Sequence, residues 1–177
     1  MRAVSKLKKR KKKIVVVASG KSAFGLNVPE DMDCMAINYA PLQSDYRVCD
    51  KKVPQELSYT DEIIIGFKDD PVDFYFDDSI KLGDHSGFRA LQIATLVMGY
   101  DETYLIGYDY YDDGEQVHYF GDEMHKYKLG WDDFFLNRKE RYKIWLSDFD
   151  TIDWSDHDIY NCNSKSELKL FEFRSIR

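Results

Sequence analysis

The sequence predicts an α/β fold in which a mainly parallel sheet forms the middle of three layers. Its apolar runs are short, continuous and rich in Val and Ile, which is typical of strands buried on both faces. These runs alternate with helical segments and turns, as in folds built from parallel strands and crossover connections. A chain of 177 residues with 44% hydrophobic and 32% charged residues fits one α/β domain, which we place at residues 14–177.

The first half of this domain contains four expected strands. Each is a short apolar run, and they cover residues 14–18, 34–37, 46–49 and 63–65. The small residues at 19–22 follow the first strand and predict a turn that opens a short helix. A polar and aromatic connection with little regular structure follows at 69–82.

The second half alternates helices with strands. Apolar side chains at helical spacing predict a helix over residues 87–98, and Gly99 suits the left-handed position that ends it. A buried strand is expected at 104–106, followed by a charged, aromatic helix at 132–147. A closing strand is expected at 158–161.

The first thirteen residues form a separate basic segment. Eight of them are Lys or Arg, so removing them from the net charge of −7 leaves the remaining chain near −15. Basic segments of this kind can bind nucleic acid or anionic membranes. Here no aromatic residues are interleaved with the charges, and an acidic body repels phosphate backbones. We therefore expect residues 1–13 to be a flexible, solvated arm, and we expect no nucleic acid among the partners.

The cysteines and the hydropathy pattern bear on the cellular compartment. Cys34, Cys49 and Cys162 are odd in number and lack CxxC spacing, which predicts buried thiols in a reducing compartment. No run approaches the roughly 18 apolar residues that a membrane span needs. The N-terminus has no apolar segment of signal-peptide length. We expect a cytoplasmic protein without a membrane span.

Small or polar side chains follow four of the expected strands. Ser19 and Gly20 follow the first strand, Asn38 the second, Asp50 the third and Asp109 the strand at 104–106. In parallel α/β folds, ligands bind at the carboxyl ends of the strands. The sequence therefore predicts a ligand site where these residues meet.

The tripeptide Gly20-Lys21-Ser22 resembles the end of a phosphate-binding P-loop. That loop requires a glycine five residues before Gly20, and this chain has Val15 there, inside a strand. A P-loop is thereby excluded. Two interpretations stay open: the turn presents backbone N–H groups to a phosphate beside a helix start, or it is a tight turn only.

Acidic and histidine side chains are concentrated after the strand at 104–106. They are Asp109, Asp112, Asp113, His118, Asp122 and His125. Such ligands would suit Mn²⁺ or Mg²⁺, but adjacent loop carboxylates usually stay in water, and we expect no metal site. His118 and His125 are either surface residues or general bases, because a histidine with a pKa of about 6.5 can deprotonate a sugar hydroxyl at neutral pH.

Five segments, taken in order, carry a resemblance to a known family. They are residues 13–22 with their strand and turn, 34–38 ending in Asn38, the Ser86-Gly87 helix start, 99–109 with its Gly-Tyr and Gly-x-Asp pattern, and 159–168. Together they resemble the bacterial sialyltransferases of the Campylobacter type and the related domain of motility accessory factors. The resemblance extends from Lys13 to about Phe173. The chain departs from the family at Ser19, where the family has asparagine, and at Lys21, where it has proline.

The resemblance implies a GT-A-like sialyltransferase fold and a pocket for a CMP-sugar. By position, the pocket would be lined by Ser19, Gly20, Asn38, Ser86, Gly87, Asp109 and Tyr111. The family's histidine base corresponds to His125, with His118 second. Tyr111 and Tyr119 correspond to the tyrosines that stabilise the departing phosphate. In this scheme the nucleotide-sugar is a substrate, and no metal or other cofactor is required.

Two other functions stay open. The related domains include archaeal pterin pyrophosphokinases, which would imply ATP and Mg²⁺ held through Asp109 and Asp112. The second alternative is a non-catalytic relative that only binds a nucleotide, because proteins that share a fold can differ in function. The acceptor, the sugar and the existence of a homo-oligomer are left open by the sequence.

Overall fold

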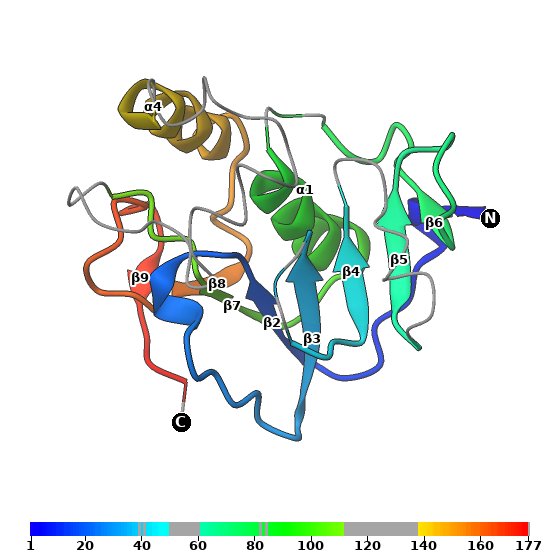
Figure 1. Ribbon diagram of the computed structural model, residues 1–177, viewed down its shortest axis with the longest axis horizontal. Coiled ribbons are helices and arrows are strands. Elements are labelled where there is room, and N and C mark those ends of the chain that lie inside the picture. Colours follow the sequence, from blue (N-terminus) through cyan, green and yellow to red (C-terminus); the bar gives the residue numbers. More distant parts are fainter. Residues whose placement is uncertain are drawn as a thin grey trace, which may run out of the picture.

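The computed structural model of the chain shows one central sheet with short helices packed against it (Figure 1). It describes residues 1–38, 40, 42–49, 61–81, 83, 85–111 and 138–176. The strands are β1 (Arg2–Ala3), β2 (Lys13–Val17), β3 (Met32–Ile37), β4 (Tyr46–Val48), β5 (Ile63–Gly66), β6 (Phe74–Tyr75), β7 (Glu102–Ile106), β8 (Asp158–Asn161) and β9 (Glu172–Phe173). The helical elements are η1 (Val4–Lys6), η2 (Lys21–Ala23), α1 (Ser86–Gln92), the π-helical η4 (Ile93–Val97) and α4 (Arg138–Phe149).

All strand pairs in this sheet are parallel, in the order β1-β6-β5-β4-β3-β2-β7-β8-β9. The expected α/β fold with a parallel sheet is therefore confirmed. Every strand predicted from an apolar run is present, with its ends within about two residues of the prediction. The strands β1, β6 and β9 were not predicted, because two residues are too few to show a hydrophobic pattern.

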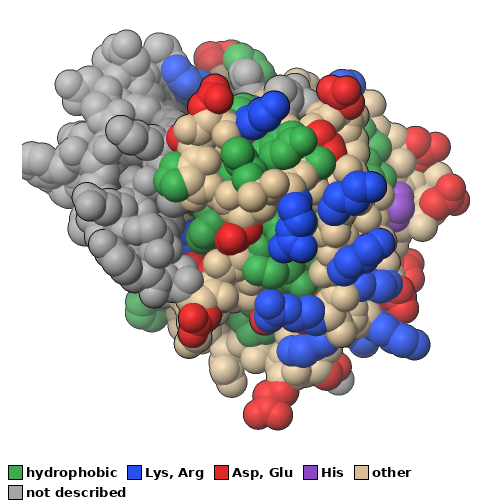
Figure 2. Space-filling view, turned by 90° about the vertical axis from the view of Figure 1, so that its right-hand side faces the viewer, with side chains coloured by type: hydrophobic (Ala, Val, Ile, Leu, Met, Phe, Trp, Pro, Cys, Tyr) green, Lys and Arg blue, Asp and Glu red, His purple; other side chains and the backbone are tan. Residues whose placement is uncertain are grey.

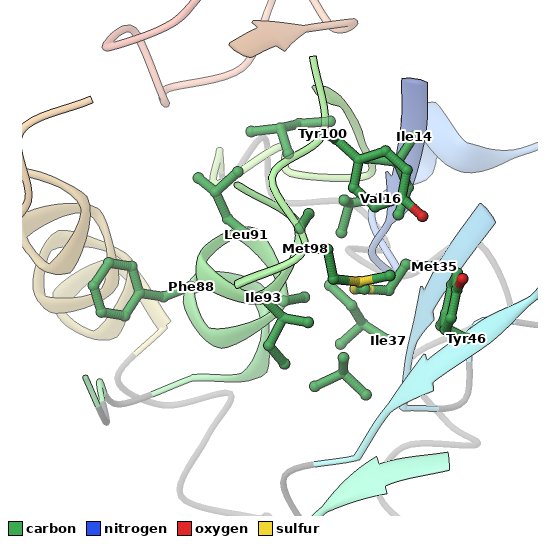
Figure 3. Close-up of a cluster of buried hydrophobic side chains, with 14 of the residues drawn as sticks. Ile14, Val16, Met35, Ile37, Tyr46, Phe88, Leu91, Ile93, Met98 and Tyr100 are labelled. Carbon is green, nitrogen blue, oxygen red and sulfur yellow. The ribbon is translucent and has the colours of Figure 1, made fainter. Parts of the chain in front are cut away.

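One face of the sheet packs against α1 and η4 to form the main core (Figure 3). Successive side chains of a strand point to opposite faces, so Ile14 and Val16 of β2 both reach this core. There they meet Leu91 and Ile93 from the helical segment, and all four side chains are fully buried. The segment ends at Gly99, whose φ of +65° is the left-handed stop expected from the sequence.

The opposite face of the sheet has a different cover. A second cluster of buried side chains includes Val15, Val17 and Tyr104, and it packs against Leu26 and Val28 from the connection between β2 and β3. In the described part of the chain this connection contains only the three-residue η2, and no α-helix lies on this face. Within these ranges, this face is therefore covered by turns and extended segments rather than by a helix, and the expected three-layer arrangement stays a prediction.

The first thirteen residues differ from the solvated arm that the sequence predicts. They pair with the sheet edge through β1 and β6, and then pass along the lower ends of the strands to β2 (Figure 1). Val4 and Leu7 are buried in the main core, at 0% and 3% exposure. Burial of these two side chains stabilises the segment by about 1.5–3 kcal/mol each. The two apolar side chains within the basic segment therefore hold this segment against the domain.

The helix α4 lies against α1 near the carboxyl ends of the strands (Figure 1). Its sequence predicts a helix over 132–147, and the described part runs from Arg138 to Phe149. Phe149 anchors it, with its ring centroid 5.5 Å from that of Phe88 on α1. None of the described helices is both long and apolar enough to cross a membrane.

Candidate functional site

The carboxyl ends of β2, β3 and β7 meet at the centre of the sheet. From β2 the chain continues to β3 on one side, and β7 later pairs with β2 on the other side. Strand order changes direction between β2 and β7, and such a switch point is where parallel α/β folds bind ligands. Three groups of residues follow these strands: Ser19 and Gly20 after β2, Asn38 after β3, and Tyr108 to Tyr110 after β7. The start of α1 lies beside them. The structure thus brings together the strand-end residues predicted after β2, β3 and β7, whereas Asp50 lies outside the described residues.

Asn38 and Ser86 form a direct contact at this edge. The side-chain amide of Asn38 donates a hydrogen bond of 3.0 Å to the hydroxyl of Ser86 at the start of α1. Asn38 has a φ of 49°, the left-handed conformation that asparagine tolerates better than most residues. Ser86 is buried and Asn38 is half-buried. Two predicted pocket residues from distant parts of the chain therefore share one polar contact.

Arg47 of β4 holds the chain that follows Asn38. Its guanidinium is buried, and its N–H groups donate to the carbonyls of Asn38, Ala40 and Leu42, each over 2.8 Å. The remaining N–H groups pair with the carboxylate of Glu62, over 2.7 and 2.8 Å. Burial raises the pKa of Glu62, but hydrogen bonds from Arg47 and Ser44 outweigh it and leave this pKa below its usual value. The ion pair fixes the backbone on the Asn38 side of the site.

Asp109 lies at the end of β7 and points into the protein. Its carboxylate accepts hydrogen bonds from the backbone N–H of Ser22 (3.0 Å), the hydroxyl of Ser22 (2.5 Å) and the amide of Asn163 (2.8 Å). Both carboxylate oxygens of Asp109 therefore already accept hydrogen bonds from donors within the protein. These contacts give Asp109 a structural role, tying β7 to the turn after β2 and to the turn after β8. A contact between Asp109 and a nucleotide stays a prediction.

The same contacts explain Gly20. A Cβ atom on Gly20 would lie 2.5 Å from an Asp109 oxygen and 2.5 Å from the carbonyl oxygen of Gly107. The N–H of Gly20 donates to that carbonyl over 3.0 Å. Two of the turn's backbone N–H groups, those of Gly20 and Ser22, are therefore occupied within the protein. Of the two interpretations of this turn, the geometry favours a tight turn, and the expected helix is only the short η2.

Gly87 also has a packing role. A Cβ atom there would lie 3.1 Å from the Tyr108 ring and 3.1 Å from the Tyr110 hydroxyl. Tyr108 donates a hydrogen bond of 2.9 Å to the carbonyl of Gly87. The glycine lets the residues after β7 lie directly against the first turn of α1.

His85 is a residue of this edge that the sequence argument did not select. It is the N-cap of α1, and its Nδ1 accepts from the N–H of Phe88 over 3.2 Å. Nε2 therefore carries the proton, which it donates to the carbonyl of Trp145 over 3.2 Å. Burial lowers the pKa of His85 to about 3. A neutral imidazole with both nitrogens in use is a poor general base, and the sequence signal for its role was its place directly before Ser86.

Tyr110 borders His85 at the same edge. Its hydroxyl is 3.5 Å from His85 Nδ1, and the ring centroids are 5.9 Å apart. Tyr110 has a φ of 52°, so it is the second non-glycine residue in left-handed conformation among the described ones, with Asn38. Burial raises its pKa well above 10, which keeps the hydroxyl protonated as a donor. Strained backbone positions of this kind are concentrated at functional sites.

Several predicted catalytic residues lie outside the described ranges. They are His118, Tyr119 and His125, together with the acidic residues Asp50, Asp112, Asp113 and Asp122. Tyr111 is described and half-buried, directly after Tyr110. Within the described residues, no group of three or more His, Cys, Asp or Glu side chains is arranged to hold a metal ion.

Comparisons with known protein families, with curated proteins and with solved structures found no match for this chain. The interpretation of the site therefore depends on its geometry and on the sequence motifs alone.

Proposed function

We propose that this protein is a small glycosyltransferase-like protein that binds a nucleotide-sugar at the carboxyl edge of β2, β3 and β7. The observation that carries the proposal is the contact between Asn38 and Ser86 beside a strand-order switch point. Such an edge is the usual ligand position in parallel α/β folds. The amide and hydroxyl groups are suited to hydrogen bonds with a base or a ribose, and Tyr110 adds an aromatic ring beside them.

The proposal includes the GT-A-like, three-layer fold of the sialyltransferases for this protein and a CMP-sugar as its donor substrate. Support comes from the parallel sheet and from the order of motifs along the chain, in which Asn38, Ser86 and Asp109 follow one another. Under this proposal the sugar is transferred by direct displacement. A histidine, His125 or else His118, takes the proton of the acceptor hydroxyl, and the hydroxyls of Tyr111 and Tyr119 stabilise the leaving phosphate.

His85 does not compete for the role of base. Its low pKa and its two hydrogen bonds assign it to the support of α1. The proposal therefore distinguishes two sets of residues: Asn38, Ser86 and Tyr110 bind the nucleotide, and histidines beyond Tyr111 do the chemistry.

The proposal is tested by thermal denaturation with a panel of nucleotides. CMP or a CMP-sugar is expected to raise the melting temperature, since a ligand at 100 times its Kd stabilises the folded state by about 2.7 kcal/mol. Parallel runs with CDP, UDP, GDP and their sugars, and with ATP in the presence and absence of Mg²⁺, identify the preferred class. A shift with ATP and Mg²⁺ alone would instead support a pyrophosphokinase. No shift with any of them at millimolar concentration would refute nucleotide binding.

Matched variants connect the shift to the site. Asn38→Gly and Ser86→Ala are expected to reduce the CMP-induced shift. Asn27→Gly and Ser155→Ala remove the same groups at exposed positions, and Ser155 precedes the amino end of β8; both are expected to leave the shift unchanged.

A further inference from the structure

The basic segment of residues 2–13 contains lysines that fix it to the domain. Lys9 Nζ donates to the carbonyl of Gly99 over 2.5 Å and pairs with Asp101 at 2.8 Å. Lys11 Nζ donates to the carbonyl of Met32 over 2.7 Å. Lys13 pairs with Glu102 at 3.0 Å. With Val4 and Leu7 buried, the segment is held in place along its whole length.

The other basic side chains of the segment face solvent. Arg2, Lys6, Lys8 and Lys12 are exposed. Within the described part of the chain, the side chains of Lys6, Lys8 and Lys12 form no hydrogen bond and no ion pair. Figure 2 shows Lys and Arg side chains gathered as a band on the face that includes the β6 edge. We call Arg2, Lys6, Lys8 and Lys12 the basic row.

Carboxylates lie along the basic row. Asp77 accepts a hydrogen bond from the hydroxyl of Ser5, and Asp101 and Asp45 pair with Lys9 and Arg10. A flat anionic surface would bring these carboxylates within the screening length of about 8–10 Å from its own charges. A single strand is flexible, so its phosphates can contact the exposed lysines while its backbone bends away from the carboxylates between them. The arrangement therefore fits a single strand better than a bilayer.

The segment also lacks groups for other kinds of contact. Its apolar residues Val4 and Leu7 are buried, so they cannot insert into a bilayer. It has no aromatic residue on which a base could stack. Lysine and arginine side chains that contact only phosphates bind nucleic acid without sequence preference.

We propose that the basic row binds the phosphate backbone of a single-stranded nucleic acid, without preference for sequence. The sequence argued against this partner, because the arm lacks aromatic residues and the body is acidic. The structure changes the second argument, since the backbone that carries these charges is held against the domain, and the nearby carboxylates disfavour a flat surface more than a flexible strand. Lys8 and Lys12 lie in the stretch that leads to the amino end of β2. The proposed nucleotide site lies at the carboxyl ends of β2, β3 and β7 and shares no residue with the basic row, so the two proposals are independent.

The test is the fluorescence anisotropy of a labelled oligouridylate titrated with the full chain. If the row makes three phosphate contacts, affinity is expected to fall about 20-fold between 50 and 200 mM salt, from a slope of about −0.7 per contact for single strands. An oligothymidylate of equal length is expected to bind equally well. An affinity that does not change with salt would overturn the proposal.

A matched pair of triple variants locates the contact. Lys6→Gln/Lys8→Gln/Lys12→Gln is expected to lose about tenfold or more in affinity at low salt. Lys139→Gln/Lys165→Gln/Lys169→Gln changes the net charge equally at exposed positions elsewhere and is expected to retain binding. Circular dichroism and melting temperature establish that both variants are folded. Equal losses in the two variants would overturn the proposal, as would binding to phosphatidylserine vesicles with none to the oligonucleotides.

Discussion

The side-chain nitrogen of Asn38 and the hydroxyl oxygen of Ser86 lie 3.0 Å apart, and their hydrogen bond joins the end of β3 to the first turn of α1. These residues are 48 positions apart in the sequence. Asn38 is held from behind by Arg47, which binds its carbonyl, and Ser86 follows the N-cap His85. The contact is therefore supported on both sides by buried groups. A rigid polar pair at a strand end is a suitable starting point for a ligand site.

The left-handed conformation of Asn38 predicts unequal effects of two substitutions. Asn38→Gly removes the hydrogen bond, at a cost of about 1 kcal/mol, and keeps a backbone that glycine adopts freely. Asn38→Ala removes the same bond and adds about 1–2 kcal/mol of backbone strain. Urea denaturation is expected to show the alanine variant as the less stable one by about 1 kcal/mol. Equal stabilities would show that this backbone is not constrained as described.

The close approach of Gly20 to β7 predicts a steric effect that removal of the Asp109 side chain does not relieve. Gly20→Ala is expected to lose about 2–3 kcal/mol, because its Cβ meets both the Asp109 carboxylate and the Gly107 carbonyl. Asp109→Ala is expected to lose a similar amount through the contacts with Ser22 and Asn163. In the double variant the Gly107 carbonyl still blocks the new Cβ. A double variant as stable as Asp109→Ala alone would contradict this account.

The buried His85 predicts a pH dependence of stability. Its pKa is about 3 in the folded protein and about 6.5 when unfolded, so the unfolded state binds a proton first as the pH falls. Its contribution to stability is complete above about pH 6.5 and is lost progressively toward pH 3, with a slope of about 1.4 kcal/mol per pH unit. His85→Asn keeps an N-cap oxygen and is expected to flatten the profile of unfolding free energy between about pH 4 and 6.

Ile65→Val is the control for this measurement, because it loosens the core on β5 and leaves the groups that bury His85 in place. It is expected to lower the free energy of unfolding at every pH and to keep the slope. An unchanged slope in His85→Asn would mean that His85 is accessible to protons in the folded state.

The ion pair between Arg47 and Glu62 predicts strong coupling. Arg47→Met leaves a buried carboxylate and three carbonyls without their donor, and is expected to cost about 3–5 kcal/mol. Glu62→Leu is expected to cost a similar amount, because it leaves the guanidinium without its counter-charge. The double variant should lose clearly less than the sum of the two, which a double-mutant cycle by urea denaturation measures. Additive losses would mean that the two side chains act separately.

The strands with apolar runs could be predicted because their residues are buried on both faces of a parallel sheet. β2 and β7 show this pattern within a few residues. The sequence could not predict β1, β6 or the ordered state of residues 1–13. These features depend on pairing with distant strands and on two buried side chains within a run of charges. Neither the strand pairing nor the burial of these two side chains leaves a local pattern in the sequence.

The position of the candidate site could be predicted from the sequence, but the roles of its residues could be predicted only in part. Residues after parallel strands meet at one edge, so Asn38 and Asp109 could be placed together from topology. Whether each side chain points outward or inward depends on its partners. For Asp109 these are Ser22 and Asn163, which no sequence pattern connects to it. His85 was missed because the sequence argument considered only the histidines after the strand at 104–106, whereas the role of His85 comes from capping α1.

The central claim is that a nucleotide binds beside Asn38 and Ser86, and a crystal structure of the protein grown with saturating CMP tests it most directly. The account predicts electron density for the nucleotide at the carboxyl ends of β2, β3 and β7, within hydrogen-bond distance of the Asn38 amide or the Ser86 hydroxyl. CMP bound at any other surface, or a carboxyl edge without density in such crystals, would contradict it.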